Sequence, residues 1–270
     1  MSYENPEVPH DVNVAPGNHL IEFLRLAAAL VLLVLLAAAV LYLAGGQLAR
    51  FIPFATEQRW VGDRVIGVKI ERNDSDVRLN QYLQQVTDSL SLVMHLPDGM
   101  RIRVHVISMK TPNAFATLGG HIVLTRELFD LMPSENALAM VIAHEIAHVK
   151  HRDPISALGG TASLGLLLAV IGGDASSLAP QVAMLVQRGY TREAERRADL
   201  DAIAALQARY GHAGGAAAVF ELLAATHADE HVGVPTLLST HPTDAERIGI
   251  LKGAARDWRA ENAPLVPLGP

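Results

Sequence analysis

The chain has 270 residues, a net charge of −6 and no cysteine. Without cysteine it has no disulfide framework, no thiol catalyst and no thiolate metal ligand. Because the charge is negative and no long basic run occurs, we expect no nucleic-acid partner.

An uncharged segment of mostly alanine, leucine and valine lies near the N-terminus, over Leu26–Gly46. About 20 such residues are enough to cross a bilayer. The polar segment 1–25 before it is too long and too acidic for an ordinary signal peptide. The sequence therefore predicts an N-terminal tail over residues 1–25 and one membrane anchor over residues 26–48, in contact with the lipid bilayer through Leu26–Gly46.

Residues 49–75 are expected to form a linker, partly extended over Ala55–Ser75, before a domain over residues 76–262. The proline-containing segment 263–270 is expected to be a disordered tail. Within the domain, helical patterns predict helices near Asp76–His95, Ser134–Lys150, Ala175–Arg209, Ala213–His227 and Asp244–Glu261.

Two strand patterns lie between the first two of these helices. Arg101–Ile107 alternates polar and apolar residues, and His121–Leu124 follows a Gly119–Gly120 turn and precedes a short helix over Arg126–Met132. The two strands are expected to form a small sheet, whose free edge can bind an extended peptide through backbone hydrogen bonds. An ordinary hairpin without a ligand is the alternative.

The pentapeptide His144-Glu145-Ile146-Ala147-His148 lies in the expected helix Ser134–Lys150. Ser134 is a good N-cap, and the helix is apolar almost all round, which is typical of a buried central helix. Residues four apart share a helix face, so both imidazoles can reach one metal ion, with Glu145 beside them. This pattern predicts a zinc hydrolase, although unrelated proteins also carry the pentapeptide.

Catalytic zinc usually has three protein ligands and one water, so a downstream carboxylate is required. The candidates lie in a helical segment over residues 190–199. Glu195 and Asp199 are four apart, so one can bind zinc while the other accepts a hydrogen bond from a ligand histidine. Glu193 is the rival ligand, but its spacing favours an ion pair with Arg197 on a solvated face.

A second uncharged run, Ile155–Gly173, has 19 residues. Its length would allow a membrane crossing, but a crossing would separate His148 from Glu195, and Ala175–Gln187 is too short to return. We therefore expect an apolar helix that packs over the active site or dips into the membrane surface.

Four segments, taken in order, resemble the motifs of peptidase family M48, and the resemblance covers about Val77 to Leu251. It implies a zincin-like metalloprotease domain with one zinc ion, bound by His144, His148 and Glu195. At Arg197 the chain departs from the family, which usually has a glutamate there, but that position is not the ligand. The four segments are Asn113–Ala116 with Gly119–Leu124, the pentapeptide, Glu193–Asp199, and Ser239–Ile248.

The chemistry of zinc and the resemblance together assign roles to further residues. Glu145 takes a proton from water and passes it to the leaving amine. His241 adds a donor to the oxyanion or closes over the zinc as a gate, and Asp199 supports a ligand histidine. Arg247 is either a substrate contact or a structural ion-pair partner. The other expected substrate-binding residues are Asn113, Ala114, Phe115, Gly120 and Ile122.

The location of the catalytic domain rests on two opposing arguments. Arg50, Arg59 and Arg64 follow the apolar run whereas only Arg25 precedes it, which favours the cytoplasm. Single-anchor bacterial relatives tend to face the periplasm, and long domains override the charge rule. We favour a single-pass protein of a bacterial-type inner membrane with its catalytic domain in the periplasm.

Taken together, the sequence predicts a mainly helical α+β protein: a zincin-like domain with a small β-sheet, preceded by one transmembrane helix. The predicted activity is that of a membrane-anchored zinc endopeptidase, which cleaves extended or misfolded membrane and envelope polypeptides. The alternative is a zinc-binding chaperone or scaffold with vestigial protease activity, although the intact Glu145 argues against it.

Overall fold

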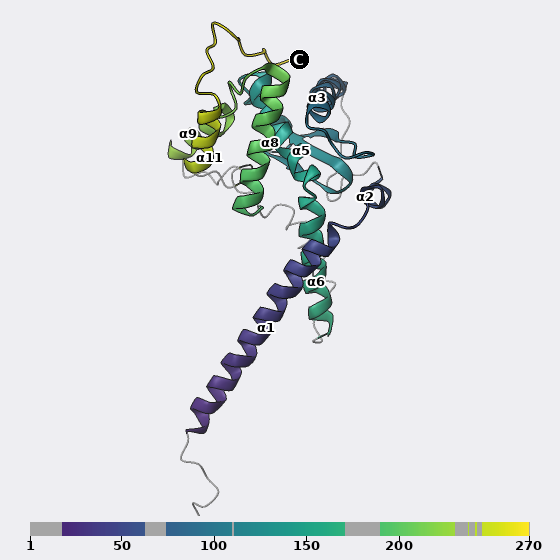
Figure 1. Ribbon diagram of the computed structural model, residues 1–270, viewed down its shortest axis with the longest axis vertical. Coiled ribbons are helices and arrows are strands. Elements are labelled where there is room, and N and C mark those ends of the chain that lie inside the picture. The colour runs from purple at the N-terminus through teal and green to yellow at the C-terminus, as the bar shows by residue number, and fades with distance from the viewer. Residues whose placement is uncertain are drawn as a thin grey trace, which may run out of the picture. The chain divides into compact units, whose positions relative to one another are not determined.

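The structure is a computed structural model that describes residues 18–62, 74–109, 111–170, 190–229, 237, 241 and 245–269. The chain divides into two compact units, Met1–Leu41 and Tyr42–Pro270. The described part of the first unit belongs to helix α1 (His19–Ala49), whose last residues belong to the second unit (Figure 1).

Helix α1 contains the predicted anchor. Within the described residues it is the one helix long and apolar enough to cross a membrane, and none of its apolar stretch is buried in the protein. The large side chains of Leu26, Leu30 and Leu33 are each more than 60 % exposed, which suits contact with lipid rather than with a protein core.

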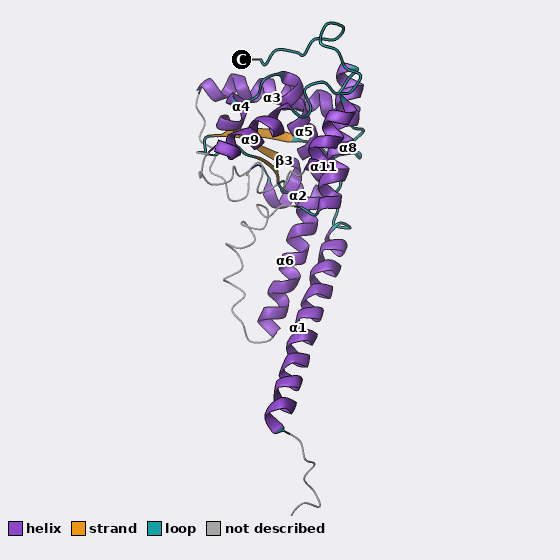
Figure 2. Cartoon of the chain, turned by 90° about the vertical axis from the view of Figure 1, so that its left-hand side faces the viewer, coloured by secondary structure: helices purple, strands orange, loops and turns teal. Residues whose placement is uncertain are grey.

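The second unit is mainly helical and contains one small mixed sheet, as predicted (Figure 2). A short 3-10 helix, Leu118–Gly120, precedes the last strand. The other elements, in chain order, are α2 (Phe54–Val61), α3 (Asp74–Val93), β1 (Arg103–Ile107), β2 (Ala114–Ala116), β3 (His121–Thr125), α4 (Arg126–Asp130), α5 (Glu135–Lys150), α6 (Asp153–Val170), α8 (Arg192–Tyr210), α9 (Ala218–Asp229) and α11 (Ala245–Ala254).

The sheet differs from the predicted pair of strands. Its order is β1-β3-β2, with β1 parallel and β2 antiparallel to the central strand β3. Strand β2 was not predicted, because three residues are too few to show an alternating pattern. Gly119 and Gly120 form the expected turn with φ values of +72° and +84°. A Cβ atom on Gly120 would lie 2.2 Å from the Arg101 carbonyl oxygen, so that position requires glycine.

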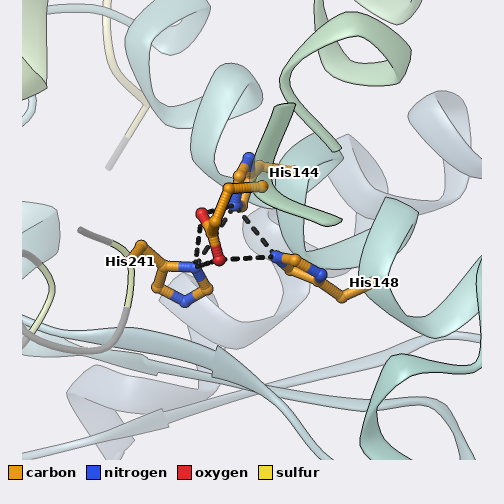
Figure 3. A group of neighbouring side chains, drawn as sticks. His144, His148 and His241 are labelled. Atoms are coloured by element: carbon orange, nitrogen blue, oxygen red, sulfur yellow. Dashed lines mark hydrogen bonds and ion pairs between the residues drawn. The ribbon is translucent and has the colours of Figure 1, made fainter. Parts of the chain in front are cut away.

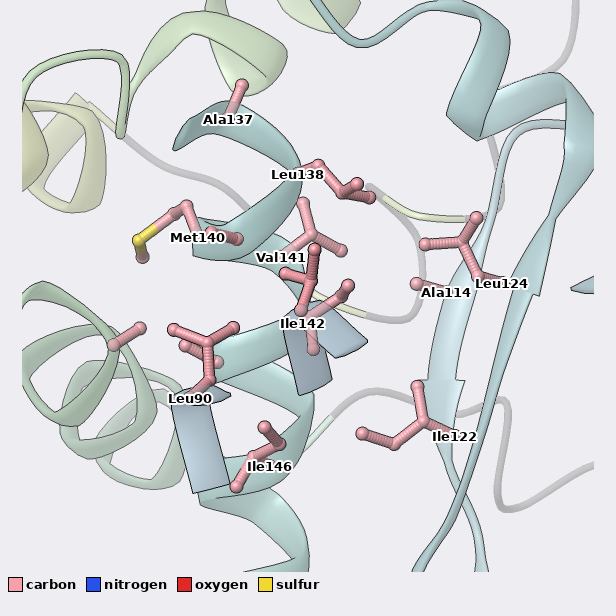
Figure 4. Packing of buried hydrophobic residues seen from close by; sticks show 14 of the residues in the cluster. Leu90, Ala114, Ile122, Leu124, Ala137, Leu138, Met140, Val141, Ile142 and Ile146 are labelled. Atoms are coloured by element: carbon pink, nitrogen blue, oxygen red, sulfur yellow. The ribbon is translucent and has the colours of Figure 1, made fainter. Parts of the chain in front are cut away.

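Helix α5 lies at the centre of the core, as its apolar sequence predicts. Its first turn is capped by the Ser134 hydroxyl, which accepts a hydrogen bond from the Ala137 amide at 3.2 Å. Leu138 and Ile142 lie between this helix and the strand residues Ile122 and Leu124 (Figure 4). All four of these side chains have no exposed surface, so the helix is held firmly against the sheet.

The two segments that flank the domain differ from expectation. The start of the predicted extended linker is helix α2, while residues 63–73 lie outside the described part. The predicted disordered tail instead packs on the domain: the Val266 amide donates to Asn136 Oδ1 at 2.8 Å, and its carbonyl accepts from the Glu135 amide at 2.9 Å. These bonds satisfy buried polar groups at the start of α5.

The remaining helices follow the predictions with shifted ends. Helix α6 confirms the apolar helix expected over Ile155–Gly173, with residues 171–173 outside the described part. Helix α8 begins at Arg192, and residues 175–189 of the helix predicted there also lie outside. Helix α11 ends at Ala254, seven residues before the predicted Glu261, because turns occupy the segment that follows.

Candidate metal centre

Two neighbouring helices supply three of the candidate metal ligands. His144 and His148 lie one turn apart on α5, and Glu195 lies in the first turn of α8. The two helices pack directly against each other. Small side chains allow such helices to approach closely enough for longer polar side chains to meet. The alanines buried completely on these helices include Ala143, Ala147, Ala198 and Ala202.

A fourth side chain, His241, approaches from the segment before α11. Ligand atoms of His144, His148, Glu195 and His241 all lie within 4.8 Å of one another, and all four residues are buried. The three imidazoles surround the Glu195 carboxylate (Figure 3). Segments 97 residues apart along the chain, at His144 and His241, thus meet at one point.

The spacing of the ligand atoms is close to that of a tetrahedral metal site. His144 Nε2 lies 3.0 Å from His148 Nε2 and 3.2 Å from Glu195 Oε2, and His148 Nε2 lies 3.6 Å from Glu195 Oε1. In a tetrahedral zinc site with bonds of about 2.0–2.2 Å, ligand atoms lie about 3.3–3.6 Å apart. The donor atoms of this site are imidazole nitrogens and carboxylate oxygens, with no sulfur, and zinc accepts such a set.

Each α5 histidine has its own carboxylate on the other ring nitrogen. Asp199 Oδ1 lies 3.0 Å from His144 Nδ1, and Asp153 Oδ2 lies 3.0 Å from His148 Nδ1. A carboxylate at Nδ1 holds the proton there and leaves the Nε2 lone pair directed at a metal. Asp199 lies where the sequence predicts the partner of a ligand histidine, whereas Asp153 was missed. The signal available was a lone carboxylate at the start of an otherwise uncharged helix.

Arg247 of α11 joins two of the acidic side chains. Its Nε and Nη2 lie 2.7 and 2.8 Å from the two oxygens of Asp199, and its Nη1 lies 2.9 Å from Glu195 Oε2. The arginine is only 5 % exposed. The structure therefore places Arg247 in a buried ion-pair network, which is one of the two roles that the sequence left open.

Glu145 lies beside the four ligand atoms and has no exposed surface. Neither of its carboxylate oxygens has a hydrogen-bond partner among the described residues, although His241 Nε2 lies 3.2 Å from Oε1. Burying a carboxylate without hydrogen bonds is costly. Such a group is explained by a ligand, a water or a cation that the site is built to receive.

Charges within the centre shift its pKa values in opposite directions. Burial lowers the pKa of His144, but the adjacent Asp199 and Glu195 carboxylates outweigh it and raise the pKa to about 10. Burial raises the pKa of Glu195, but His241 and His144 outweigh it and hold the pKa well below its usual range. The metal-free centre is therefore a network of charged pairs, in which an incoming cation replaces protons.

Tyr190 is a further residue that the sequence did not single out for a role. Its ring stacks on His148, with 4.0 Å between ring centroids and 30° between ring planes. Burial and the nearby carboxylates raise the pKa of its hydroxyl well above the ordinary value. The Tyr190 ring therefore packs on one face of the His148 imidazole, while Asp153 contacts its Nδ1 atom.

The chain was compared with protein families and with curated proteins. The model of Peptidase family M48 matches residues 78–255, which is more than half of the chain. The chain belongs to peptidase family M48. Membership implies protease activity, and M48 peptidases depend on a metal, which the cluster of His144, His148, Glu195 and His241 could hold.

Relatives within the M48 family are proteases of bacteria. A putative beta-barrel assembly-enhancing protease of Vibrio cholerae is 31% identical over 220 residues, covering 71% of this chain and 43% of the relative. The beta-barrel assembly-enhancing protease of Escherichia coli is 31% identical over 186 residues, covering 60% and 38%. A protease HtpX homolog of Salinibacter ruber is 29% identical over 188 residues, covering 57% and 68%. The chain thus spans less than half the length of the first two relatives.

The expected substrate-binding residues of this M48 domain lie in and around the sheet. Ile122 belongs to the central strand β3, both of whose edges are already paired, and its side chain is fully buried. Gly120 lies in the turn before this strand. Asn113, Ala114 and Phe115 lie at or in β2, which is an edge strand. The sheet has two edge strands, β1 and β2, and the Val104 and Val106 amides of β1 already donate to Gln84 and Asn80 of α3, while Ile122 serves the core.

Arg197, where the M48 resemblance showed a departure, does not pair with Glu193 in the way its spacing indicated. Its Nη2 lies 3.0 and 3.2 Å from the two oxygens of Asp153. Glu193 is exposed at the start of α8 and is not among the clustered ligand side chains, so the geometry favours Glu195 over Glu193 as the ligand.

Proposed function

We propose that the chain is a membrane-anchored, zinc-dependent endopeptidase that cleaves extended segments of misfolded membrane or envelope proteins. The observation that carries this proposal is the position of Glu145. Its carboxylate is completely buried, lacks a hydrogen-bond partner among the described residues, and adjoins four side chains that can bind a metal. A centre that only bound metal would have no use for a buried carboxylate that lacks hydrogen bonds.

Glu145 has the chemistry of a general base and acid. A zinc ion held by His144, His148 and Glu195 supplies a Lewis acid that lowers the pKa of water to about 7 and polarises the scissile carbonyl. Glu145 accepts the proton of the attacking water and donates it to the leaving amine nitrogen.

His241 is proposed to gate the centre. Its Nδ1 lies 3.3 Å from His144 Nε2 and 3.1 Å from Glu195 Oε1, a spacing that suits a fourth ligand. Its Nε2 faces Glu145 at 3.2 Å. In this position the His241 ring bridges Glu145 and Glu195, so it would occupy the side of the centre on which Glu145 would meet a bound water. The ring must swing away before the centre can hydrolyse a peptide, so this arrangement is the closed state.

Strand β2 is proposed to bind the substrate. The Thr117 amide donates to the His121 carbonyl at 2.7 Å and the Thr125 amide donates to the Asn113 carbonyl at 2.9 Å. In an antiparallel ladder, alternate residues point their amide and carbonyl groups to the other side. Ala114 and Ala116 therefore direct these groups away from β3. Both residues are fully buried, so an extended peptide must displace what covers this edge before it can pair with them.

The substrate class follows from α1 and from the relatives. The predicted anchor would keep the centre beside a membrane, and two relatives are named for enhancing β-barrel assembly. We therefore propose polypeptides of the bacterial envelope or inner membrane as substrates, with the catalytic domain in the periplasm. A zinc-binding scaffold with vestigial activity is disfavoured by the retained Glu145.

The deciding experiment compares Glu145→Gln with Glu193→Gln in the full-length protein. Glu193 is an exposed glutamate close to the centre, so its replacement controls for loss of charge. We expect both variants to retain zinc and only Glu145→Gln to lose cleavage of casein. Equal cleavage by Glu145→Gln and the parent would refute the mechanism.

The ligand assignment has its own test. Glu195→Ala should release zinc, because it removes one of three ligands, while Glu193→Ala should retain it. Zinc content after gel filtration measures both. The reverse result would move the third ligand from Glu195 to Glu193.

A further inference from the structure

The turn between α5 and α6 is held by the segment that follows α1. This turn, His151–Asp153, begins three residues after His148, and the segment Arg50–Glu57 contacts it at several points. We propose that the segment Arg50–Glu57 positions the zinc ligand His148 through Asp153, so that the end of the membrane anchor is a structural part of the metal centre. The inference rests on the proposed zinc site.

Asp153 is the centre of this connection. One of its oxygens lies 3.0 Å from His148 Nδ1, and Arg197 Nη2 contacts both oxygens at 3.0 and 3.2 Å. Arg50 Nη2, one residue beyond the end of α1, donates to Asp153 Oδ1 at 3.5 Å. The side chain of Asp153 is 3 % exposed, so these contacts are only weakly screened by solvent. These contacts hold the Asp153 carboxylate in place, and the carboxylate in turn holds the His148 imidazole.

Arg152 gives a second connection to the same turn. Its φ of +64° lies in the left-handed region, which is unfavourable for a residue with a long side chain. Its guanidinium forms an ion pair with Glu57 at 2.5 Å, donates to the Ile52 carbonyl, and lies 5.5 Å from the centre of the Phe54 ring. The segment Arg50–Glu57 thereby supplies the contacts that hold the strained turn in place.

The last two turns of α1 set the position of this segment. They pack so closely on α6 that a Cβ atom on Gly159 would lie 2.4 Å from the Ala49 Cβ, and one on Gly45 would lie 2.7 Å from the Gly159 carbonyl oxygen. Small residues on both helices are typical of tight helix pairs in membranes. Arg50 follows directly on this contact, so its reach to Asp153 depends on the α1–α6 contact remaining intact.

Zinc affinity tests the connection independently of catalysis. In the full-length protein in detergent, competition with a chromophoric chelator should show zinc binding weakened about 10- to 100-fold by Asp153→Ala, the usual effect of losing such a partner. Asp153→Asn retains an oxygen that accepts from Nδ1 and should recover part of the loss. Arg50→Ala should weaken binding several-fold, and Arg50→Lys less.

Arg59→Ala is the matched control, since Arg59 is an exposed arginine of α2 whose guanidinium donates to Ala55 and Thr56 of its own helix. It should leave the affinity unchanged. The absorption spectrum of the cobalt-loaded protein should change in the Asp153 variants and not in Arg59→Ala.

Parent-like affinity and cobalt spectra in both Asp153→Ala and Arg50→Ala would overturn the inference. Parent protein that binds no zinc would instead overturn the proposed function on which it rests. If Asp153→Ala does not fold, Arg50→Ala decides, because Arg50 is 37 % exposed at its side chain and its loss leaves Arg197 on Asp153.

Discussion

Replacing Arg247 tests whether this residue holds the centre together or contacts substrate. Arg247→Ala removes three charged contacts of 2.7, 2.8 and 2.9 Å, to Asp199 and Glu195, at a side chain that is 6 % exposed. Removing one partner of a buried ion pair costs about 3–5 kcal/mol, because the other charge stays buried. We expect the metal-free domain to lose this much stability.

Thermal unfolding of the full-length protein with a chelator present measures the loss. For a domain of this size, about 2–4 °C are lost per kcal/mol, so the midpoint should fall by roughly 6–20 °C. Lys252→Ala is the matched control, since Lys252 lies on the same helix and pairs with Glu221 at 2.6 Å on the surface. An exposed pair contributes about 0–1 kcal/mol, so this variant should unfold close to the parent.

The result separates two roles. If Arg247→Ala unfolds within a degree or two of Lys252→Ala but no longer cleaves casein, Arg247 contacts substrate and the ion-pair assignment is wrong. If the midpoint falls as expected, adding Asp199→Asn to Arg247→Ala should recover part of it, because the second change removes the carboxylate that the first leaves without its partner.

Three further predictions concern the centre and its edge strand. His241→Ala should retain zinc and cleave a short peptide faster than the parent, because the substitution removes the ring from the site of the attacking water. Slower cleavage with zinc retained would instead indicate that His241 donates a hydrogen bond to the oxyanion. Because the pKa of His144 is raised to about 10, zinc must displace a proton from this residue when it binds. The affinity for zinc should therefore rise about tenfold per pH unit for each displaced proton between pH 6 and 8. A zinc affinity that does not change with pH would contradict this. Ala116→Pro removes the outward amide of β2 and should lower kcat/KM about tenfold with zinc content unchanged, whereas parent-like kcat/KM would exclude this edge.

Local patterns in the sequence were sufficient wherever the structure is local. The cap at Ser134 and the apolar sequence predicted α5, and the four-residue spacing of Glu195 and Asp199 placed both carboxylates on the side of α8 that faces the histidines. Helix periodicity decides such positions, because 3.6 residues per turn fix which side chains share a face.

Contacts between distant segments could not be predicted in the same way. Asp153 reaches His148 because the turn at Arg152 adopts a left-handed conformation, which no pattern in the sequence predicts. Arg247 pairs with Asp199, which lies 48 residues earlier in the chain, so this pair depends on how α11 packs against α8. Strand β2 is too short for a periodic signal, and it exists because β3 offers an edge beside it.

On the proposed membrane anchoring, the contact between Arg50 and Asp153 would also limit the distance from the bilayer at which a chain can be cut. With α1 in the membrane as proposed, only two side chains separate the end of the transmembrane helix from a zinc ligand. A substrate with its own membrane segment would then need only a few extended residues, at about 3.3–3.6 Å each, to reach the centre. Cleavage would fall close to the lipid surface, and folded parts of a substrate that stand further from it would be spared.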